Sequence, residues 1–300
     1  MTEAARGTLT RRAAIASVGV ATVLLGLKLW AARATGSVAM LGSLADTALD
    51  LFASLVTFYA VWLAAQPADE DHRFGHGKAE AIAALMQTLV ILGSAVVIGW
   101  RAFTQLGVTE LPTRAGVGVG VSLAGIVMTL ALVAYQRRIV RATGSIAIGT
   151  DQLHYQSDLL LNVAVILALA LDVWAGLHGA DAVFGIGIAL YLAVGAIRSA
   201  QAAIDMLMDR EWPDAKRARL LAVVGAHAEV ESVHELRTRS SGVTDFIQFH
   251  IWLAPDMTVA CAHDIVDAVE ADVAAAFPGA EILVHIDPRG HYDRPQPVEA

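Results

Sequence analysis

Four ionisable residues lie within long apolar stretches of the sequence. Asp46 and Asp50 are four residues apart, and so are His154 and Asp158. In a helix, residues four apart lie on the same face, so both members of a pair can contact one ligand. Three carboxylates and an imidazole suit a tetrahedral Zn²⁺ ion, with Fe²⁺, Co²⁺, Cd²⁺ and Mn²⁺ as competitors, and the absence of thiolates from this set argues against Cu⁺.

Helix packing is the alternative role for these four residues. An isolated Asp near the centre of a bilayer costs about 3 kcal/mol on insertion scales, and hydrogen bonds or ion pairs between helices offset such a cost without any ion. We see no Lys or Arg near the two pairs to neutralise them, and both pairs fall at a similar depth along their helices. This favours a shared divalent cation. Asp151 and Asn162 flank the second pair and are interpreted as polar lining.

Two further groups carry metal-ligating side chains. Asp69, His72 and His76 have spacings that a loop can close around one ion, although a solvated polar loop is an equally good interpretation. The last third of the chain holds a larger group, in which a surface histidine is the default role for any single member: His234, His250, His263, His285 and Asp287. Because most of these histidines fall on predicted strands, we interpret the group as a second candidate metal cluster.

The elements that position these residues are mainly long apolar helices. The 300 residues are 56% apolar and 17% charged, with a mean hydropathy of +0.57. Crossing a bilayer core of about 30 Å takes roughly 20 helical residues. Six segments meet that length, and the first is too long for the apolar part of a signal peptide, so it is expected to be retained. They are residues 13–30, 38–65, 79–103, 115–135, 146–174 and 180–207.

The distribution of charge gives an orientation and excludes some functions. Arginines and lysines fall on alternate sides of the predicted spans, which by the positive-inside rule places both termini and the loop 66–78 in the cytoplasm. The net charge of −8 and the lack of a basic patch exclude nucleic-acid binding. The single cysteine, Cys261, excludes a disulfide framework and a Cys-rich metal site.

After about Asp209 the sequence changes to that of a small soluble α/β domain with the order αββαβ. Pro213 is expected to open a helix to His227, and strands are expected at 233–239 and 244–253. Asp256 is expected to cap a helix that runs to Phe277, before a last strand at 281–287. We therefore predict a transmembrane domain at 1–208, a cytoplasmic domain at 209–290 and a disordered tail at 291–300.

Several motifs in the sequence resemble those of the cation diffusion facilitator family, and within it the bacterial zinc and ferrous-iron efflux pumps. The resemblance covers nearly the whole chain, and together its motifs are highly specific. They are Gly42 to Asp50, Gln66 to Glu80, Leu153 to Asp158, His234 to Arg239 and His285 to Pro288.

The resemblance implies a homodimer of six-helix protomers in a bacterial inner membrane, which exchanges cytoplasmic metal for external protons. It assigns the Asp/Asp and His/Asp pairs to the transport site and Asp69, His72 and His76 to a loop site. It also assigns the C-terminal histidines and Asp287 to a metallochaperone-like domain, with His263 as a neighbouring ligand. Finally, it implies a pair, Lys78 and Asp209, that links the two domains.

Two other function classes fit less well. An intramembrane metalloprotease needs an open metal position and a general base, typically in an HExxH motif, and no HExxH occurs. A passive divalent channel favours weak, hydrated sites, whereas four dehydrating ligands hold a transition metal too tightly for fast conduction. A secondary transporter, and not an enzyme, is therefore the predicted function.

Overall fold

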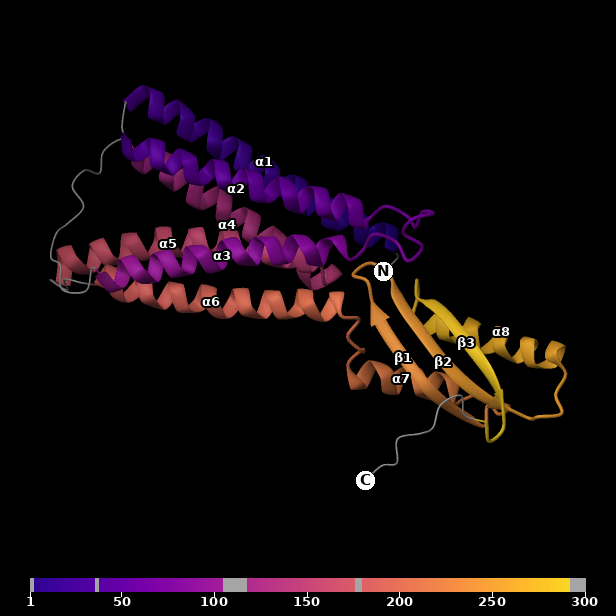
Figure 1. Ribbon diagram of the computed structural model, residues 1–300. Helices are drawn as coiled ribbons and strands as arrows, with labels where there is room; N and C mark the ends of the chain where they lie inside the picture. Colours follow the sequence, from indigo (N-terminus) through magenta and orange to yellow (C-terminus); the bar gives the residue numbers. More distant parts are fainter. Residues whose placement is uncertain (1–2, 36–37, 105–117, 176–179, 292–300) are drawn as a thin grey trace. The chain divides into compact units, whose positions relative to one another are not determined.

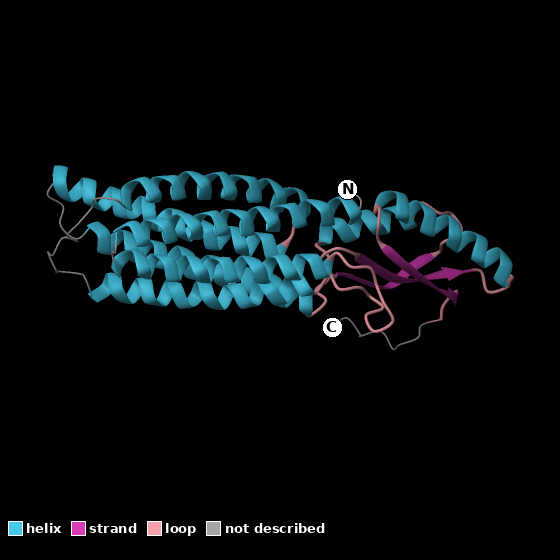
Figure 2. Ribbon diagram, turned by 90° about the horizontal axis from the view of Figure 1, so that it is seen from above, coloured by secondary structure: helices cyan, strands magenta, loops and turns pink. Residues whose placement is uncertain are grey.

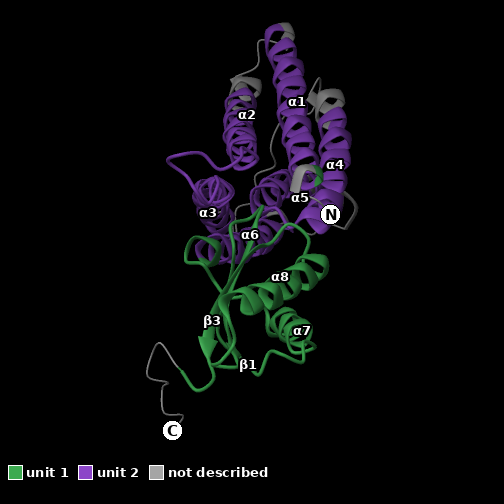
Figure 3. Ribbon diagram, turned by 90° about the vertical axis from the view of Figure 1, so that its right-hand side faces the viewer, with its two compact units in different colours: residues 1–5, 205–300 green, residues 6–204 purple. Residues whose placement is uncertain are grey.

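The computed structural model describes residues 3–35, 38–104, 118–175 and 180–291. The chain divides into two compact units, one formed by residues 6–204 and the other by residues 205–300 with residues 1–5 (Figure 3). The first unit is a bundle of six long helices that run alongside one another (Figures 1 and 2). These helices are α1 (Glu3–Thr35), α2 (Val38–Ala64), α3 (Ala79–Thr104), α4 (Gly118–Thr143), α5 (Ile146–Ala175) and α6 (Ala180–Leu207).

Five of the six helices contain a stretch long and apolar enough to cross a membrane. Within the described residues these stretches are Ala5–Arg33, Ser43–Ala64, Ala79–Thr104, Leu123–Thr143 and Ala182–Leu207. The remaining helix, α5, has a suitable length of 30 residues. The structure thus supports five spans, and a sixth span on α5 stays a prediction.

The bundle packs through small side chains and turns large apolar ones outward. On α3, Ala84 and Ile91 are almost fully buried, whereas Leu89, Val96 and Trp100 are largely exposed. An outward apolar face of this kind suits contact with lipid tails. Gly185 of α6 lies so close to α3 that a Cβ there would meet the Cβ of Ala102 at 2.8 Å, which agrees with the expected role of small residues in helix packing.

The C-terminal unit has the predicted order αββαβ. Its elements are α7 (Asp214–Val224), β1 (Ser232–Ser240), β2 (Asp245–Leu253), α8 (Val259–Ala276) and β3 (Glu281–Pro288). β2 is the central strand, antiparallel to β1 and parallel to β3. Alternate residues of β2 from Ile247 to Leu253 are buried with Leu220 of α7 and Val269 of α8 in one core, so the helices cover one face of the sheet. This leaves the alternate residues, including Gln248 and His250, on the other face, as the period-two pattern predicts.

Several predicted boundaries need correction. α8 is capped by Thr258, whose side chain accepts a hydrogen bond from the backbone of Cys261, and not by Asp256. α7 ends at Val224, before His227, because Gly225 follows it as the C-terminal cap. α4 continues to Thr143, well past the predicted end at Tyr135, since its last turns pack polar side chains inside the bundle. The predicted tail falls almost wholly outside the described residues.

Candidate metal centres

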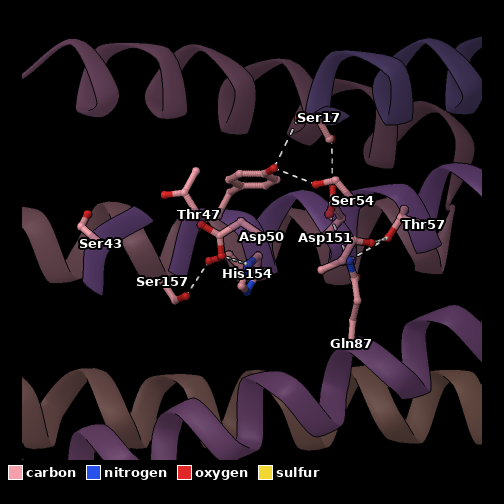
Figure 4. Close-up of polar contacts among 12 residues, drawn as sticks. Ser17, Ser43, Thr47, Asp50, Ser54, Thr57, Gln87, Asp151, His154 and Ser157 are labelled. Atoms are coloured by element: carbon pink, nitrogen blue, oxygen red, sulfur yellow. Dashed lines mark hydrogen bonds and ion pairs between the residues drawn. The ribbon is translucent and has the colours of Figure 1, made fainter. Parts of the chain in front are cut away.

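The first candidate centre lies between α2 and α5. His154 Nε2 is 3.0 Å from Asp50 Oδ1, and Asp50, His154 and Asp158 each offer a ligand atom within 4.8 Å of the others. Figure 4 shows Asp50 and His154 facing one another across the two helices. Asp158 lies one turn beyond His154 on α5, as the four-residue spacing requires.

Asp46 is the one member of the predicted set that the structure keeps apart from this group. It lies one turn before Asp50 on α2 and is exposed, whereas Asp50 is half-buried. The group of three with converging ligand atoms does not include it. The same face of α2 carries both carboxylates, so their positions on the helix agree with the prediction although only Asp50 reaches α5.

A lysine lies close to this centre, which corrects the expectation that no cation does. Lys28 of α1 donates a hydrogen bond to Thr47 Oγ1 at 2.6 Å and another to the Ser43 carbonyl at 3.4 Å. Thr47 lies between Asp46 and Asp50 on α2. The sequence held a signal for this residue, since a lysine inside an apolar span is itself a candidate for function.

Asp151 is the centre of a fully buried hydrogen-bond network one turn from His154. Its Oδ2 accepts from Ser17 Oγ and Gln136 Nε2, both at 2.7 Å, and its Oδ1 accepts from Gln87 Nε2 at 3.0 Å. Gln87 also donates to Thr57 Oγ1 at 2.7 Å. Side chains of α1, α3 and α4 therefore donate to one carboxylate of α5, and Thr57 of α2 joins the network through Gln87. Figure 4 shows Ser17, Thr57 and Gln87 around Asp151, a role that the interpretation as polar lining had missed.

Glu80 is a second buried carboxylate that sequence reasoning had not singled out. It lies in the first turn of α3, is 4% exposed and accepts a hydrogen bond from Ser145 Oγ at 2.6 Å. Ser145 directly precedes α5, and its own hydroxyl accepts from the backbone of Ile148. Because an acidic group beside the first turn of a helix is favourable, this contact fixes the N-terminal end of the helix that carries His154.

The second candidate centre is the loop between α2 and α3. Asp69 contacts His72 Nδ1 through Oδ1 and His76 Nε2 through Oδ2, each at 3.2 Å. The hydrogen bond from the backbone of His72 lowers the pKa of Asp69 and outweighs the opposing effect of desolvation. Gly75 takes a left-handed conformation with φ of +76°, which permits the turn that brings His76 back to Asp69. The three predicted residues are thus brought together.

The third candidate centre lies on the open face of the C-terminal sheet. His234, His250 and His285 are directly opposite one another on the three strands, so they form one row across the sheet. Asp287 Oδ2 lies 3.1 Å from His234 Nε2 and 2.9 Å from His250 Nδ1, and its Oδ1 lies 3.4 Å from His285 Nε2. The register of β1 shifts immediately after His234, and such a bulge can re-aim a side chain.

Asp287 has a lowered pKa, although its side chain is almost fully buried. Burial would raise the pKa of this carboxyl, but the hydrogen bond from His250, the charge of His285 and the hydrogen bond from His234 together lower it. A carboxylate that stays ionised among imidazoles is a ready ligand for a divalent ion.

His263 is not brought to this cluster. It lies on α8, on the helix-covered side of the sheet, where it is 72% exposed and 3.8 Å from Asp267. A ligand role for His263 within the single chain is therefore not supported by its position. The alternation of β2 explains this, because His250 faces away from the helices.

The predicted pair of Lys78 and Asp209 would join the two units, and it stays a prediction. Lys78 directly precedes α3. Asp209 follows α6 with a left-handed φ of +55°, and its Oδ1 is 3.4 Å from Arg239 of β1.

Known proteins are similar to this chain over most of its length. The model of the cation efflux transmembrane domain matches residues 14–208, and that of the cation efflux protein cytoplasmic domain matches residues 212–289. The cation-efflux pump FieF of Klebsiella pneumoniae subsp. pneumoniae is 44% identical over 282 residues, which is 94% of each chain. The FieF of Cronobacter sakazakii is 44% identical over 283 residues, again 94% of each.

A solved structure of the zinc transporter CzrB in its zinc form is 32% identical, with a TM-score of 0.27. The match covers 29% of this chain and 99% of that one.

Proposed function

The chain belongs to the cation efflux family, the cation diffusion facilitators, and from that premise we propose that this transporter exports cytoplasmic Zn²⁺ in exchange for external protons. Membership makes the chain a membrane transporter of cations and not an enzyme. The observation that carries the choice of ion is the convergence of Asp50, His154 and Asp158 from α2 and α5. Two carboxylates with one imidazole form a mixed oxygen and nitrogen set that suits Zn²⁺, with Fe²⁺ and Cd²⁺ as secondary substrates.

The proposal includes Asp46 as the fourth ligand. It shares a helix face with Asp50, one turn away, and a divalent ion between α2 and α5 would draw its carboxylate inward. α5 then serves as the sixth span, with its polar residues turned toward this site and away from lipid. Polar residues at membrane depth are acceptable where they face a bundle interior or an ion pathway.

Proton exchange follows from the chemistry of the ligands. Carboxylates and a neutral imidazole bind metal only when deprotonated, so protons and metal compete for the same atoms. We propose that the site loads from the cytoplasm, is exposed to the outside when the bundle rocks, and there exchanges metal for protons. Both termini lie in the cytoplasm of a bacterial inner membrane in this scheme.

The two outer centres have supporting roles in the proposal. The loop residues Asp69, His72 and His76 hold a second ion at the cytoplasmic end of α3. In the C-terminal domain, His234, His250, His285 and Asp287 hold a regulatory ion, and the chain acts as a homodimer. An ion bound only by the folded, assembled domain adds its binding energy to that state. A contact between Lys78 and Asp209 would tie the two units together.

Vesicle transport tests the proposal. The purified protein is placed in liposomes with a metal-sensitive and a pH-sensitive dye in an acidic lumen, and Zn²⁺, Fe²⁺, Cd²⁺ or Mn²⁺ is added outside. We expect Zn²⁺ to enter fastest and the lumen to become alkaline in step. Zn²⁺ entry without proton movement would support a channel instead, and no entry of any metal would exclude the transport site.

A further inference from the structure

Lys28 places an ammonium group inside the first apolar helix. It lies within the stretch Ala5–Arg33, which is long and apolar enough to span a membrane. A lysine at that depth is expensive and usually marks a functional or a paired position. Its hydrogen bonds go to the Thr47 hydroxyl and the Ser43 carbonyl, and both of these acceptors are neutral. The charge of Lys28 is therefore not cancelled by the groups that hold it.

The position of Thr47 brings this charge to the transport site. Thr47 follows Asp46 directly and precedes Asp50 by three residues, and residues three apart on a helix have Cβ atoms about 5–6 Å apart. Figure 4 shows Thr47 and Asp50 as neighbours on α2, with His154 beside Asp50. A hydrogen bond of 2.6 Å to Thr47 Oγ1 thus holds the ammonium about one helical turn from the carboxylates.

The charges of the site do not balance without this lysine. The proposed site counts three carboxylates, since it includes Asp46 as its fourth ligand beside Asp50 and Asp158, and its imidazole is neutral when it binds metal. A divalent ion cancels two of the three negative charges. The third would leave a net negative charge among apolar helices, where an uncompensated charge is costly.

We propose that Lys28 is the fixed counter-charge of the transport site, which makes the metal-loaded site electrically neutral. The inference rests on the proposed function, because it assumes that a divalent ion binds between α2 and α5 with Asp46 as its fourth ligand. Two opposite effects on transport follow. Lys28 repels the incoming ion and so weakens metal binding, while it lowers the cost of moving the loaded site through the bundle.

A packing role is the rival explanation. In that case the bond between Lys28 and Thr47 only joins α1 to α2, and its charge is irrelevant. The two explanations differ in what happens when the hydrogen bond and the charge are removed separately. Thr47→Val removes the hydroxyl acceptor and leaves the charge, whereas Lys28→Gln removes the charge and leaves a side chain that can still donate to Thr47.

The test measures KM and kcat for Zn²⁺ in vesicles for wild type, Lys28→Gln, Lys28→Arg and Thr47→Val. KM for transport reads the transport site alone, unlike total metal binding, to which the other centres contribute. For Lys28→Gln we expect both KM and kcat to fall, each on the order of tenfold. Removing one nearby charge changes the electrostatic free energy of the bound ion by roughly the amount that corresponds to a tenfold change in an equilibrium constant. Lys28→Arg keeps the charge and is expected to stay close to wild type in both constants. Thr47→Val is expected to change both constants much less than Lys28→Gln, because the ammonium stays and loses only one of its two acceptors.

Each other outcome decides against the inference. Wild-type constants in Lys28→Gln, or equal changes in Lys28→Gln and Thr47→Val, would show that the charge has no role. If Lys28→Gln does not fold, Lys28→Met keeps the apolar stem and is measured in its place, with the same expectation. A wild-type protein that carries no Zn²⁺ would overturn the proposed function, whereas a working wild type with an indifferent Lys28 would overturn this inference alone.

Discussion

Asp151 and Asp158 lie on one face of α5, two turns apart, in opposite surroundings. Asp151 is fully buried and both of its oxygens accept hydrogen bonds, from Ser17, Gln87 and Gln136. Asp158 is only half-buried. In the cluster of Asp50, His154 and Asp158, the close contact between α2 and α5 is the one that joins Asp50 to His154. The same residue type is thus an anchor at one turn and an open ligand at another. The two carboxylates differ in whether the protein itself supplies their hydrogen-bond donors.

This comparison explains how a mobile site can sit in a stable bundle. A carboxylate whose partners come from several helices holds those helices in register, because each donor left behind on breaking the network costs about 1–3 kcal/mol. Carboxylates that lack such donors need an ion or protons. Alternating access requires a fixed anchor and an open site. The anchor keeps the helices together while they move, and the ligands of the open site exchange metal for protons.

The largest expected effect comes from removing a ligand of the open site. Asp50→Ala is expected to lower Zn²⁺ transport on the order of 100-fold or more, because altering even the partners of metal ligands costs 10–100-fold. Folding should be little affected, since Asp50 is half-buried and its contact with His154 is a single hydrogen bond, unlike the network around Asp151. Ser157→Ala is the matched control, because the hydrogen bond that the described residues give the Ser157 hydroxyl goes to the backbone carbonyl of His154 and to no side chain.

Transport in vesicles and monodispersity in detergent are measured for both variants. If Asp50→Ala carried Zn²⁺ at the wild-type rate, Asp50 would not belong to the transport site.

Replacing Asp151 or Asp158 by leucine compares the buried anchor with the open site. Asp151→Leu takes one acceptor each from the buried donors Ser17, Gln87 and Gln136, so the free energy of unfolding should fall by about 3 kcal/mol or more. Asp158→Leu removes a charge without such donors and should leave stability unchanged or higher, while it abolishes transport. Thermal unfolding in detergent, monitored by gel filtration, ranks the stabilities of the two variants. Equal stabilities would mean that Asp151 does not anchor the bundle.

A smaller effect is expected from the identity of the nitrogen ligand. His154→Asp makes the site entirely oxygen, which favours harder ions, so the ratio of Zn²⁺ to Mn²⁺ transport should fall by about tenfold. The ratio is the informative quantity, since an added carboxylate also changes the response to protons. Uptake of both metals is compared in matched vesicles at one proton gradient. An unchanged ratio, with both metals still carried, would mean that His154 does not contact the ion.

The sequence predicted most of this arrangement where spacing alone determines position. Residues four apart share a helix face, which placed His154 with Asp158, and alternation along β2 placed His250 on the open face. It failed where a contact depends on how helices rotate against one another. The donors of Asp151 come from α1, α3 and α4, and no spacing along the chain encodes that meeting.

Two further results have the same origin. Lys28 reaches α2 from α1, and Asp46 stays out of the group although Asp50 joins it. Neither result follows from spacing along the chain.

The smallest effect is expected at the edge of the anchor, where Thr57 accepts a hydrogen bond from Gln87 at 2.7 Å. Thr57→Val keeps the shape of the side chain and removes this acceptor, together with the bond that the hydroxyl donates to the Ala53 carbonyl of its own helix. Gln87 still donates to Asp151. Stability should therefore fall by about 1 kcal/mol, the worth of one ordinary hydrogen bond.

Thr88→Val is the matched control, because the Thr88 hydroxyl is buried in the same bundle without a hydrogen-bond partner in the described part of the chain. Its loss should leave stability unchanged or raise it. Thermal unfolding and Zn²⁺ transport are measured side by side for both variants. If Thr57→Val slowed transport as strongly as Asp50→Ala while stability held, the network around Asp151 would belong to the transport site and the contrast between anchor and site would be wrong.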